Sequence, residues 1–452
     1  MAKTKQSKQK FHFKMQNHME IPWSKVIKPD AHQPVTQATL TEKSSVIGRV
    51  GMIMLACGTG AWRVRDSMNT MARILQVSCS ADIGLVSLSY SCFDAQEHHS
   101  VTEALSLPKS GVNTDKLAAM ENFITLFESE GAFLSVQEVH HLLDKIQNKP
   151  TNYTPLLLGL AAACACSAFV FLLGGGPVEM FCTFLGAGLG NYTRATMNKH
   201  HLTLFAGLAT GVAVACLTYL LVSRLLEFSL GINVAHEAGY IGSMLFAIPG
   251  FPFITSGLDI AKSDMRSGIE RMVHAATIII VATLVGWLVA LASDLRPDNF
   301  VPLNLTPWQL CLLRLPASFV GVFGFSVMFN SSKKMAASAA CLGAIANTLR
   351  LELVDLTALP PAAAAFFGAL TAGLLASVVH KKIGYPRISL TVPAIVIMVP
   401  GLYMYRAAYY LGVGSIASGA QWLLNALMIF VFLPFGLIFA RILMDADWRY
   451  SS

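Results

Sequence analysis

The residues with the clearest chemical potential lie in one stretch, AIPGFPFITSGLDIAKSDMRSGIER, at positions 247–271. Pro249, Gly250 and Pro252 interrupt an apolar run there, and proline breaks a helix because it lacks the backbone N–H and clashes with the preceding turn. The helix that restarts after such a break has unpaired N–H groups at the positive end of its dipole. Such groups bind carboxylates, so the sequence predicts a substrate site at this break, with a kink that serves only helix packing as the alternative.

Three polar residues follow the break. Thr255 and Ser256 would either contact a substrate hydroxyl or bond to the carbonyl groups of the preceding turn. Asp259 lies nearest the apolar run, and a carboxylate in or near a membrane is costly and typical of a proton relay. We therefore predict that Asp259 couples transport to protons. The later charges are interpreted as markers of the cytoplasmic side, with Lys262, Asp264 and Arg266 paired among themselves and Arg271 beyond them.

A second break, VPGLYMY at positions 399–405, places the same Pro-Gly pair inside another apolar run. Pro400 and Gly401 are predicted to interrupt that helix, and Tyr403 follows them. Arg406 is then a candidate clamp for a substrate carboxylate, with an interfacial anchor as the alternative. The two breaks predict one binding site between two interrupted helices.

Two predicted membrane spans end in similar segments, GLGNYTR (188–194) and AIANTLR (344–350). They pair Asn191 with Asn347 and Arg194 with Arg350 at one offset, so these residues are predicted to form two polar ends of a substrate pathway. The arginines would otherwise be anchors that reach the membrane interface. Glu179, just after GGGP, is a candidate second titrating group or a cap of the helix that starts there.

The composition defines the class of protein in which these residues act. The chain has 452 residues, 54% of them apolar and 13% charged, and its mean hydropathy is +0.55. These values are typical of a polytopic membrane protein. We interpret the net charge of +7 as a topology signal, so no nucleic-acid partner is expected. Walker A, zinc-site and G-x-S-x-G patterns do not occur in the sequence.

We therefore predict a transporter and no enzyme, with no catalytic residue, no metal site and no cofactor. The expected partners are a small-molecule substrate, protons and the lipid bilayer, and a homo-oligomer is compatible with the sequence.

The chain divides into four predicted segments: a disordered basic tail at 1–45, a small cytoplasmic α/β domain at 46–149, and two membrane repeats at 150–300 and 301–452. The tail has eight lysines and too few apolar residues for a core. In the domain, helices are predicted at 46–57, 61–77 and 114–129 and from 135 onward, and strands at 83–90 and 101–107. Ser135 and Glu138 are expected to form a capping box.

A membrane span needs about 20 residues. Ten are predicted, at 154–174, 177–191, 202–222, 239–257, 273–293, 308–329, 335–349, 361–380, 388–405 and 418–442. The spans at 177–191 and 335–349 are expected to be unusually short. The first five spans belong to the repeat at 150–300 and the last five to the repeat at 301–452. Because five is an odd number, the second repeat would enter the membrane from the opposite side, and the two repeats would be inverted.

The basic residues favour cytoplasmic termini at both ends. One side of the predicted topology collects Arg194, Lys199, Lys262, Arg266, Arg271, Lys333, Lys334, Lys381, Lys382 and Arg387. The other side collects Arg224, Arg296, Arg314, Arg350 and Arg406. A secretory signal is not expected, because the first apolar run is short and carries Arg49.

With these features assembled, the chain resembles the threonine/serine exporter family over residues 46–445. The segment GAWRVRDSMNTMARIL (60–75) resembles the family's N-terminal signature, and the segments around the two breaks resemble the motifs of its membrane halves. Arg65 departs from the acidic residue expected in the signature. The resemblance implies a cytoplasmic domain followed by ten membrane helices in the bacterial cytoplasmic membrane, exporting small hydroxy amino acids in exchange for protons.

Two alternatives remain open at this point. Relatives of the family are associated with export of small dicarboxylates such as succinate, a substrate for which Arg194, Arg350 and Arg406 should all matter. Alternatively, the chain is a membrane-anchored enzyme or sensor that acts through residues 46–149, where Asp66 and Asn69 share a polar helix face. That face would otherwise dock on the membrane part.

Overall fold

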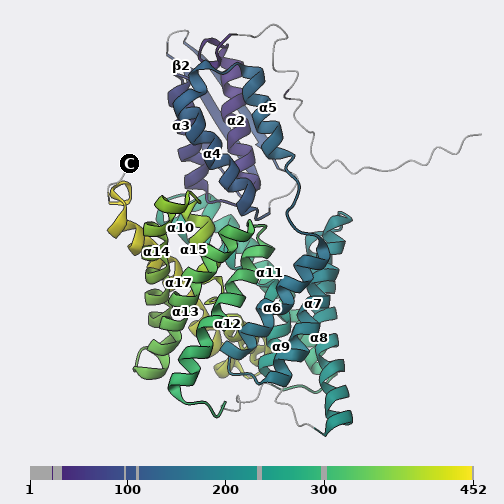
Figure 1. The fold of residues 1–452 in the computed structure, drawn as a ribbon. Helices are drawn as coiled ribbons and strands as arrows, with labels where there is room; N and C mark the ends of the chain where they lie inside the picture. The colour runs from purple at the N-terminus through teal and green to yellow at the C-terminus, as the bar shows by residue number, and fades with distance from the viewer. Residues whose placement is uncertain are drawn as a thin grey trace, which may run out of the picture.

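The structure is a computed structural model of the whole chain, and it describes residues 23, 33–95, 98–107, 111–231, 237–296 and 303–449. A small N-terminal domain stands on one end of a long helix bundle (Figure 1). Most of the segment predicted as a basic tail lies outside the described residues.

The N-terminal domain combines four helices with a small sheet, as its predicted α/β class requires. Its elements are η1 (Val35–Gln37), α2 (Leu40–Ala56), α3 (Ala61–Ile74), β1 (Ser78–Ile83), β2 (Ser87–Asp94), β3 (His99–Ser106), α4 (Thr114–Glu130), η2 (Gly131–Phe133) and α5 (Val136–Gln147). The expected capping box of Ser135 and Glu138 is present at the start of α5.

The first helix begins earlier than predicted. Residue 46 lies inside α2, which starts at Leu40 because Thr39 and Glu42 form a capping box. The Thr39 N–H and hydroxyl both donate to Glu42 Oε2, at 3.0 and 2.8 Å. The end of the predicted tail is therefore part of the folded domain.

The three strands form one antiparallel sheet in the order β1-β2-β3. The strand predicted at 83–90 is wrong in its bounds, because it spans a turn closed by a hydrogen bond of 2.9 Å from Gly84 N to Ser87 O. β1 was not predicted, although SCSADI alternates polar and apolar residues, because Cys79 and Ala81 are small and only Ile83 is a strong strand former.

The membrane part consists of long helices and two broken ones. The helices are α6 (Pro155–Leu172), α7 (Pro177–Lys199), α8 (Leu204–Leu230), α9 (Glu237–Met244), α10 (Gly250–Ala261), α11 (Met265–Ala292), α12 (Pro307–Met328), α13 (Lys333–Leu356), α14 (Pro361–Ile383), α15 (Arg387–Val396), α16 (Gly401–Gly412) and α17 (Ile416–Met444), with 3-10 turns η3 (Leu245–Ala247) and η4 (Ala446–Trp448).

Within the described residues, seven helices are long and apolar enough to cross a membrane. Two bent pairs add up to two more spans: α9 and η3 with α10, bent by 63°, and α15 with α16, bent by 48°. The helix α7 is less apolar and is not among the seven, yet it packs between α6 and α8. The chain is thus a multi-pass membrane protein.

The two spans predicted to be short are not short. α7 has 23 residues and α13 has 24, because the polar residues after Asn191 and Asn347 continue each helix. Neither continuation contains glycine or proline, and its polar side chains are compatible with a helix.

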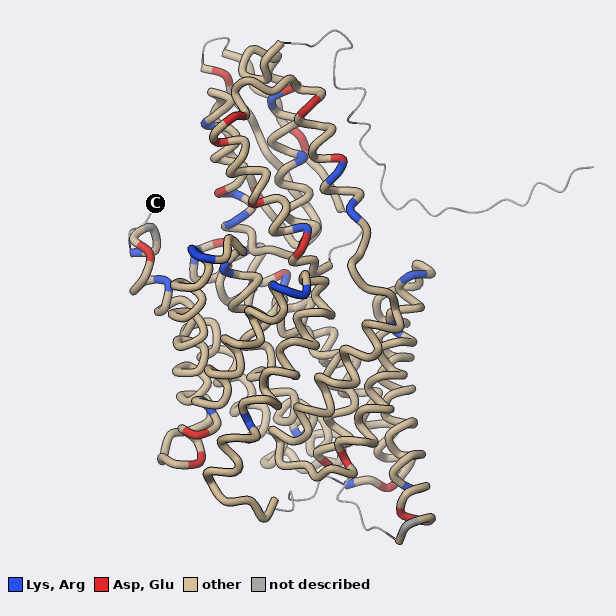
Figure 2. Tube along the Cα trace, viewed as in Figure 1, with Lys and Arg blue, Asp and Glu red and all other residues tan. Residues whose placement is uncertain are grey.

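Both described ends of the chain lie at the same end of the bundle, here called the junction end. Trp448 packs edge-on against Trp62 of the N-terminal domain, with ring centroids 5.3 Å apart. Charged residues gather at the junction end and at the opposite, far end, and the helices between them are almost free of charge (Figure 2).

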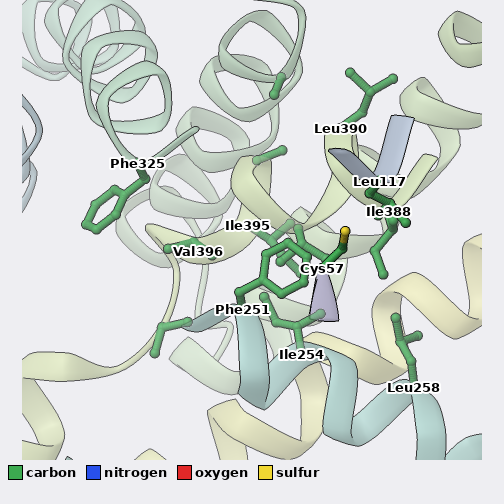
Figure 3. Packing of buried hydrophobic residues seen from close by; sticks show 14 of the residues in the cluster. Cys57, Leu117, Phe251, Ile254, Leu258, Phe325, Ile388, Leu390, Ile395 and Val396 are labelled. Carbon is green, nitrogen blue, oxygen red and sulfur yellow. The ribbon is translucent and has the colours of Figure 1, made fainter. Parts of the chain in front are cut away.

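The apolar core is continuous between the two parts. Cys57 and Leu117 of the N-terminal domain belong to the same buried cluster as Phe251 and Ile254 of α10 and Ile388 of α15. Figure 3 shows these side chains next to one another. The N-terminal domain is therefore packed onto the membrane part, and the broken helices α10 and α15 provide the contact surface.

Candidate functional site

The two breaks have the same local structure. Pro249 has φ −82° and ψ 58°, and the Gly250 N–H donates to Ile248 O at 2.9 Å. Pro400 has φ −80° and ψ 55°, and the Gly401 N–H donates to Val399 O at 2.8 Å. Both are inverse γ-turns. IPG and VPG therefore end one half-helix and start the next in the same way.

The two breaks also pack against each other. A Cβ on Gly250 would lie 3.1 Å from Val396 and 3.2 Å from Val399, at the second break. A Cβ on Gly401 would lie 2.2 Å from Ile248 and 2.7 Å from Leu245, at the first break. The contact is reciprocal, so apolar side chains fill the space at the crossing, the place where the two broken helices meet.

The broken helices run in opposite directions. α9 contacts α16 and α10 contacts α15, so the first half of each pair lies beside the second half of the other. The free N–H groups at the starts of α10 and α16 consequently point toward opposite ends of the crossing.

The hydroxyls after the first break are used within the protein. Thr255 Oγ1 donates to Phe251 O and to Pro252 O, both at 3.1 Å, which is the bonding to the preceding turn that the sequence left open. Ser256 Oγ donates to Gly268 O at 2.8 Å and ties α10 to α11.

The paired asparagines hold equivalent helices together. Asn191 Nδ2 donates to Leu158 O on α6 at 2.8 Å, and Asn347 Nδ2 donates to Ser318 Oγ on α12 at 2.9 Å. The Oδ1 atom of each asparagine is buried and has no hydrogen-bond partner among the described residues.

The paired arginines both lie near a break. Arg194 donates to Phe246 O at 3.3 Å, just before the first break, and its guanidinium stacks on the Phe246 ring. Arg350 lies close enough to Tyr403, just after the second break, to interact electrostatically. Its Nε is buried and finds no acceptor in the described part of the chain.

Glu179 caps a helix at the far end. Its Oε2 accepts from Gly176 N at 2.9 Å, at the start of α7, and its Oε1 accepts from Gly239 N at 3.2 Å, in α9. This arrangement is the capping role that the sequence gave as the alternative to titration.

Arg406 forms a two-pronged ion pair with Glu237 at the far end. Both of its hydrogen bonds are 2.6 Å long, and they join α16 to the start of α9. The guanidinium also lies 4.6 Å from the ring centroid of Trp422, against which Tyr403 packs edge-on.

Asp259 forms the corresponding ion pair at the junction end. Its Oδ2 lies 3.2 Å from Arg271 Nε and accepts from Ser267 Oγ at 3.1 Å, and both charged side chains are almost wholly buried. Its Oδ1 lies 2.5 Å from where a Cβ of Gly60 would be, at the start of α3. Arg271 donates to Gly58 O at 3.1 Å, so the pair holds the loop before α3.

Two of the three charges interpreted as a self-paired loop instead bind the N-terminal domain, and the third, Lys262, lies 4.4 Å from the ring centroid of Trp448. Asp264 pairs with Arg65, and Arg266 pairs with Asp82 as well as with Glu270 on its own helix. That interpretation was wrong because the domain docks directly on these residues. The ion pair with Asp264 also gives Arg65 a role as a cation, at a position where an acidic residue was expected.

A cavity of about 630 Å³ opens at the same junction. It lies between α3 and α4 of the N-terminal domain and the ends of α10, α14, α15 and α17. Its charged, amide and aromatic lining residues are Trp62, Arg63, Arg65, Asp66, Asn69, Glu121, Asn122, Lys262, Asp264, His380, Tyr385, Arg387, Arg441, Asp445 and Trp448.

The cavity is an unfavourable place for uncompensated positive charge. Burial lowers the pKa of Arg63 to about 10, the nearby Asp66 opposes this shift, and Arg387 adds to it. Arg63 pairs with Glu121, and Arg387 pairs with Asp445 at 3.1 Å.

Sequence reasoning missed several of these residues. Glu237 and Arg271 complete the two buried ion pairs, and the signal available for both was a charge next to an apolar run, where a partner is expected. Arg441 and Trp448 lie far in sequence from Trp62, and no sequence pattern joins them.

Comparisons with known proteins give the following matches. A family model described as putative threonine/serine exporter matches residues 45–293, and one described as Threonine/Serine exporter, ThrE, matches residues 314–443. A protein named probable threonine/serine exporter from Mycobacterium tuberculosis is 22% identical over 82% of this chain and 70% of its own length. A protein named probable succinate transporter subunit YjjP from Escherichia coli is 24% identical over 56% of this chain and 96% of its own length. No solved structure matches the chain.

Proposed function

Because this chain belongs to the threonine/serine exporter family, we propose that it is a secondary transporter that exports threonine and serine across the bacterial cytoplasmic membrane in exchange for protons. The family is one of transporters, so we propose no enzymatic reaction for the N-terminal domain.

The observation that carries the proposal is the pair of identical Pro-Gly breaks that cross in opposite directions. Interrupted helices of this kind place free N–H groups near the middle of a membrane, where a substrate carboxylate binds. We propose that the starts of α10 and α16 take the carboxylate when the apolar contacts between the breaks open. Asp259 is proposed to carry the coupled proton.

We also propose that the membrane part consists of two inverted five-helix repeats, α6–α11 and α12–α17. The helix contacts support this arrangement because many of them have a counterpart in the other half. The contact of α6 with α7 corresponds to that of α12 with α13, and the contact of α10 with α17 corresponds to that of α16 with α11. The repeats account for the tenth span, α7, whose counterpart α13 is apolar enough to cross a membrane.

We place the junction end in the cytoplasm. Support comes from the basic residues, since the loops and helix ends there include Lys199, Lys262, Lys333, Lys381 and Arg387, whereas the far end is poorer in lysine and arginine. Both termini would then be cytoplasmic.

Transport into proteoliposomes tests the proposal directly. The purified full-length protein is reconstituted, a pH gradient is imposed, and uptake of labelled threonine, serine and succinate is measured, each also with the other two as unlabelled competitors. We expect proton-driven threonine flux that serine inhibits. Absence of flux with all three compounds would refute the transport proposal.

A dicarboxylate such as succinate is the second candidate substrate. The relative from Escherichia coli carries the name of a succinate transporter subunit, and the junction cavity is rich in arginine. Succinate flux without threonine flux in the same proteoliposomes would select this candidate. Variants of Arg194, Arg350 and Arg406 should then each reduce the flux.

A further inference from the structure

The junction cavity is lined by polar groups that have no hydrogen-bond partner among the residues that the structure describes. Arg441, on the last turn of α17, is 9% exposed, and its guanidinium lies 5.1 and 5.0 Å from the ring centroids of Trp62 and Trp448, which pack edge-on against each other. No hydrogen bond or ion pair joins the Arg441 side chain to any residue that the structure describes. Contact with the indole rings engages the charge of the guanidinium and leaves its N–H groups able to bind an acceptor.

Two neighbouring groups are unsatisfied as well. The Nε1–H of Trp62 and the Nε2 atom of His380 are buried, and neither has a hydrogen-bond partner among the described residues. A buried polar group without a partner is unfavourable. The Trp62 indole N–H can only donate, whereas His380 Nε2 donates or accepts according to its tautomer, so a ligand that accepts hydrogen bonds fits this part of the cavity.

The acidic residues of the cavity do not fill this role. Glu121 pairs with Arg63, and Asp445 pairs with Arg387. Arg63 and Arg387 are both close enough to act on Arg441 with the same sign of charge, and Asp445 opposes them. Because Asp445 is paired with Arg387, the region around Arg441 retains an excess of positive charge. The ligand that fits this field is an anion.

We propose that the junction cavity binds a small carboxylate, which accepts hydrogen bonds from the Arg441 guanidinium and the Trp62 Nε1–H. A carboxylate matches the planar fork of an arginine, and a cavity of about 630 Å³ is large enough for an amino acid or a short dicarboxylate. The site deepens the proposed function, on which it rests for its role: it receives the substrate from the cytoplasm before the substrate reaches the crossed breaks.

The opposite wall of the cavity offers partners for the rest of the substrate. Asp66 is exposed there, and Asn69 and Asn122 lie beside it on α3 and α4. These groups suit an ammonium and a hydroxyl, so the site favours threonine and serine over succinate, which would place a second carboxylate against Asp66.

Binding is tested on the full-length protein in detergent, without transport. Threonine, serine, succinate, threoninamide and inorganic phosphate are each titrated, and heat release and tryptophan fluorescence are followed. We expect threonine and serine to bind, and threoninamide, which lacks the carboxylate, not to bind. Arg441→Gln should weaken threonine binding about 10-fold or more, whereas Arg441→Lys, which keeps the charge, should lose less.

The control is Arg224→Gln, which removes an exposed arginine at the far end and should leave binding unchanged. Thermal unfolding of each variant shows whether it is folded, and Trp62→Phe, which removes the indole N–H and part of the ring but keeps an aromatic face, should weaken binding a few-fold. Equal threonine affinity in wild type and Arg441→Gln would overturn the proposal, and so would binding of phosphate in preference to every carboxylate.

The outcomes separate this inference from the proposed function. Threonine flux in proteoliposomes together with Arg441-independent binding would refute the cavity site and leave the transporter standing. Arg441-dependent binding without flux of any substrate would support the site and refute the transporter.

Discussion

Two buried ion pairs lie at opposite ends of the crossed half-helices, and they differ in what they join. Asp259 and Arg271 connect α10 and α11 to the loop before α3, whereas Glu237 and Arg406 connect the two broken helices to each other. A buried pair is a weak source of net stability, yet removing one partner is strongly destabilising. Each ion pair can therefore stabilise the present arrangement of helices, and neutralising one of its partners would destabilise that arrangement.

Asp259→Asn tests the proton-coupling role. The variant removes the titrating carboxylate, so a pH gradient should no longer drive threonine uptake, while exchange of threonine for threonine at equal pH should persist. Both fluxes are measured in proteoliposomes. Glu270→Gln, which alters an acidic residue at the same junction, should keep the pH-driven flux. Full pH-driven flux in Asp259→Asn would show that the proton is carried elsewhere.

The same variant leaves Arg271 buried without its partner, at a cost of about 3–5 kcal/mol. The double variant Asp259→Asn/Arg271→Gln removes that cation and should recover much of the lost thermal stability without recovering coupling. A double variant that regains pH-driven flux would mean that the loss in Asp259→Asn was only structural.

His140 should make the N-terminal domain sensitive to acid. It is buried on α5, bonded to Ser45 and Arg49, and burial together with the Arg49 charge lowers its pKa from 6.5 to about 4. Between these values the unfolded chain binds a proton and the folded chain does not. Stability is therefore complete above pH 6.5 and falls as the pH drops toward 4, by about 2 kcal/mol at pH 5.

Thermal unfolding of the full-length protein between pH 7 and pH 5 checks this expectation. His140→Gln keeps polar atoms near Ser45 and Arg49 but does not titrate, so its stability should change less over this range. Identical pH profiles for wild type and His140→Gln would contradict the expectation. His141, the exposed neighbour on the same helix, provides the matched control as His141→Gln.

At the scale of elements, the broken helices depend on glycine for their close contact. The two glycines occupy equivalent positions, but the space around them differs: the nearest atom to a Cβ on Gly401 would be at 2.2 Å, and to one on Gly250 at 3.1 Å. Inserting a methyl group where atoms already touch forces side chains or backbone to shift.

Gly401→Ala should therefore disturb the crossing more than Gly250→Ala does. We expect Gly401→Ala to lose most threonine flux and to cost about 1–3 kcal/mol of stability, and Gly250→Ala to have a smaller effect on both. Flux assays and thermal unfolding of the two variants provide the measurement. Equal effects, or a larger effect at Gly250, would contradict the packing described here.

At the scale of the whole molecule, the N-terminal domain contacts both membrane halves. On one side it binds α10 and α11 through the buried pair of Asp259 and Arg271. On the other side the start of α4 binds the turn between α12 and α13, where Thr114 Oγ1 shares a hydrogen bond of 2.7 Å with Ser331 Oγ. A rearrangement of the two membrane halves would consequently move the N-terminal domain and change the junction cavity between this domain and the membrane part.

The inverted arrangement predicts opposite exposure of two equivalent loops. His200 follows α7 near the junction, and Thr357 follows α13 at the far end. In a background without the exposed native cysteines, His200→Cys should react with a membrane-impermeant thiol reagent only from the cytoplasmic side, and Thr357→Cys only from outside. Labelling of both from one side would refute the inverted repeats.

The sequence by itself determined the class of the protein and the position of its breaks. Apolar runs, capping residues and Pro-Gly pairs act locally, so the helices of the N-terminal domain, the bent pairs and the family resemblance could be recognised without a structure. The helix ends after Asn191 and Asn347 were misjudged, because polar residues at a membrane boundary do not stop a helix.

Only the tertiary structure decided which charges meet. Asp259 and Arg271 are 12 positions apart, Glu237 and Arg406 are 169 apart, and Arg441 meets Trp62 across almost the whole chain. Such pairings depend on how helices pack and on where the N-terminal domain docks, and neither has a local signature. The physical reason is that the free-energy effect of a charge depends on how deeply it is buried, and burial is a property of the assembled fold.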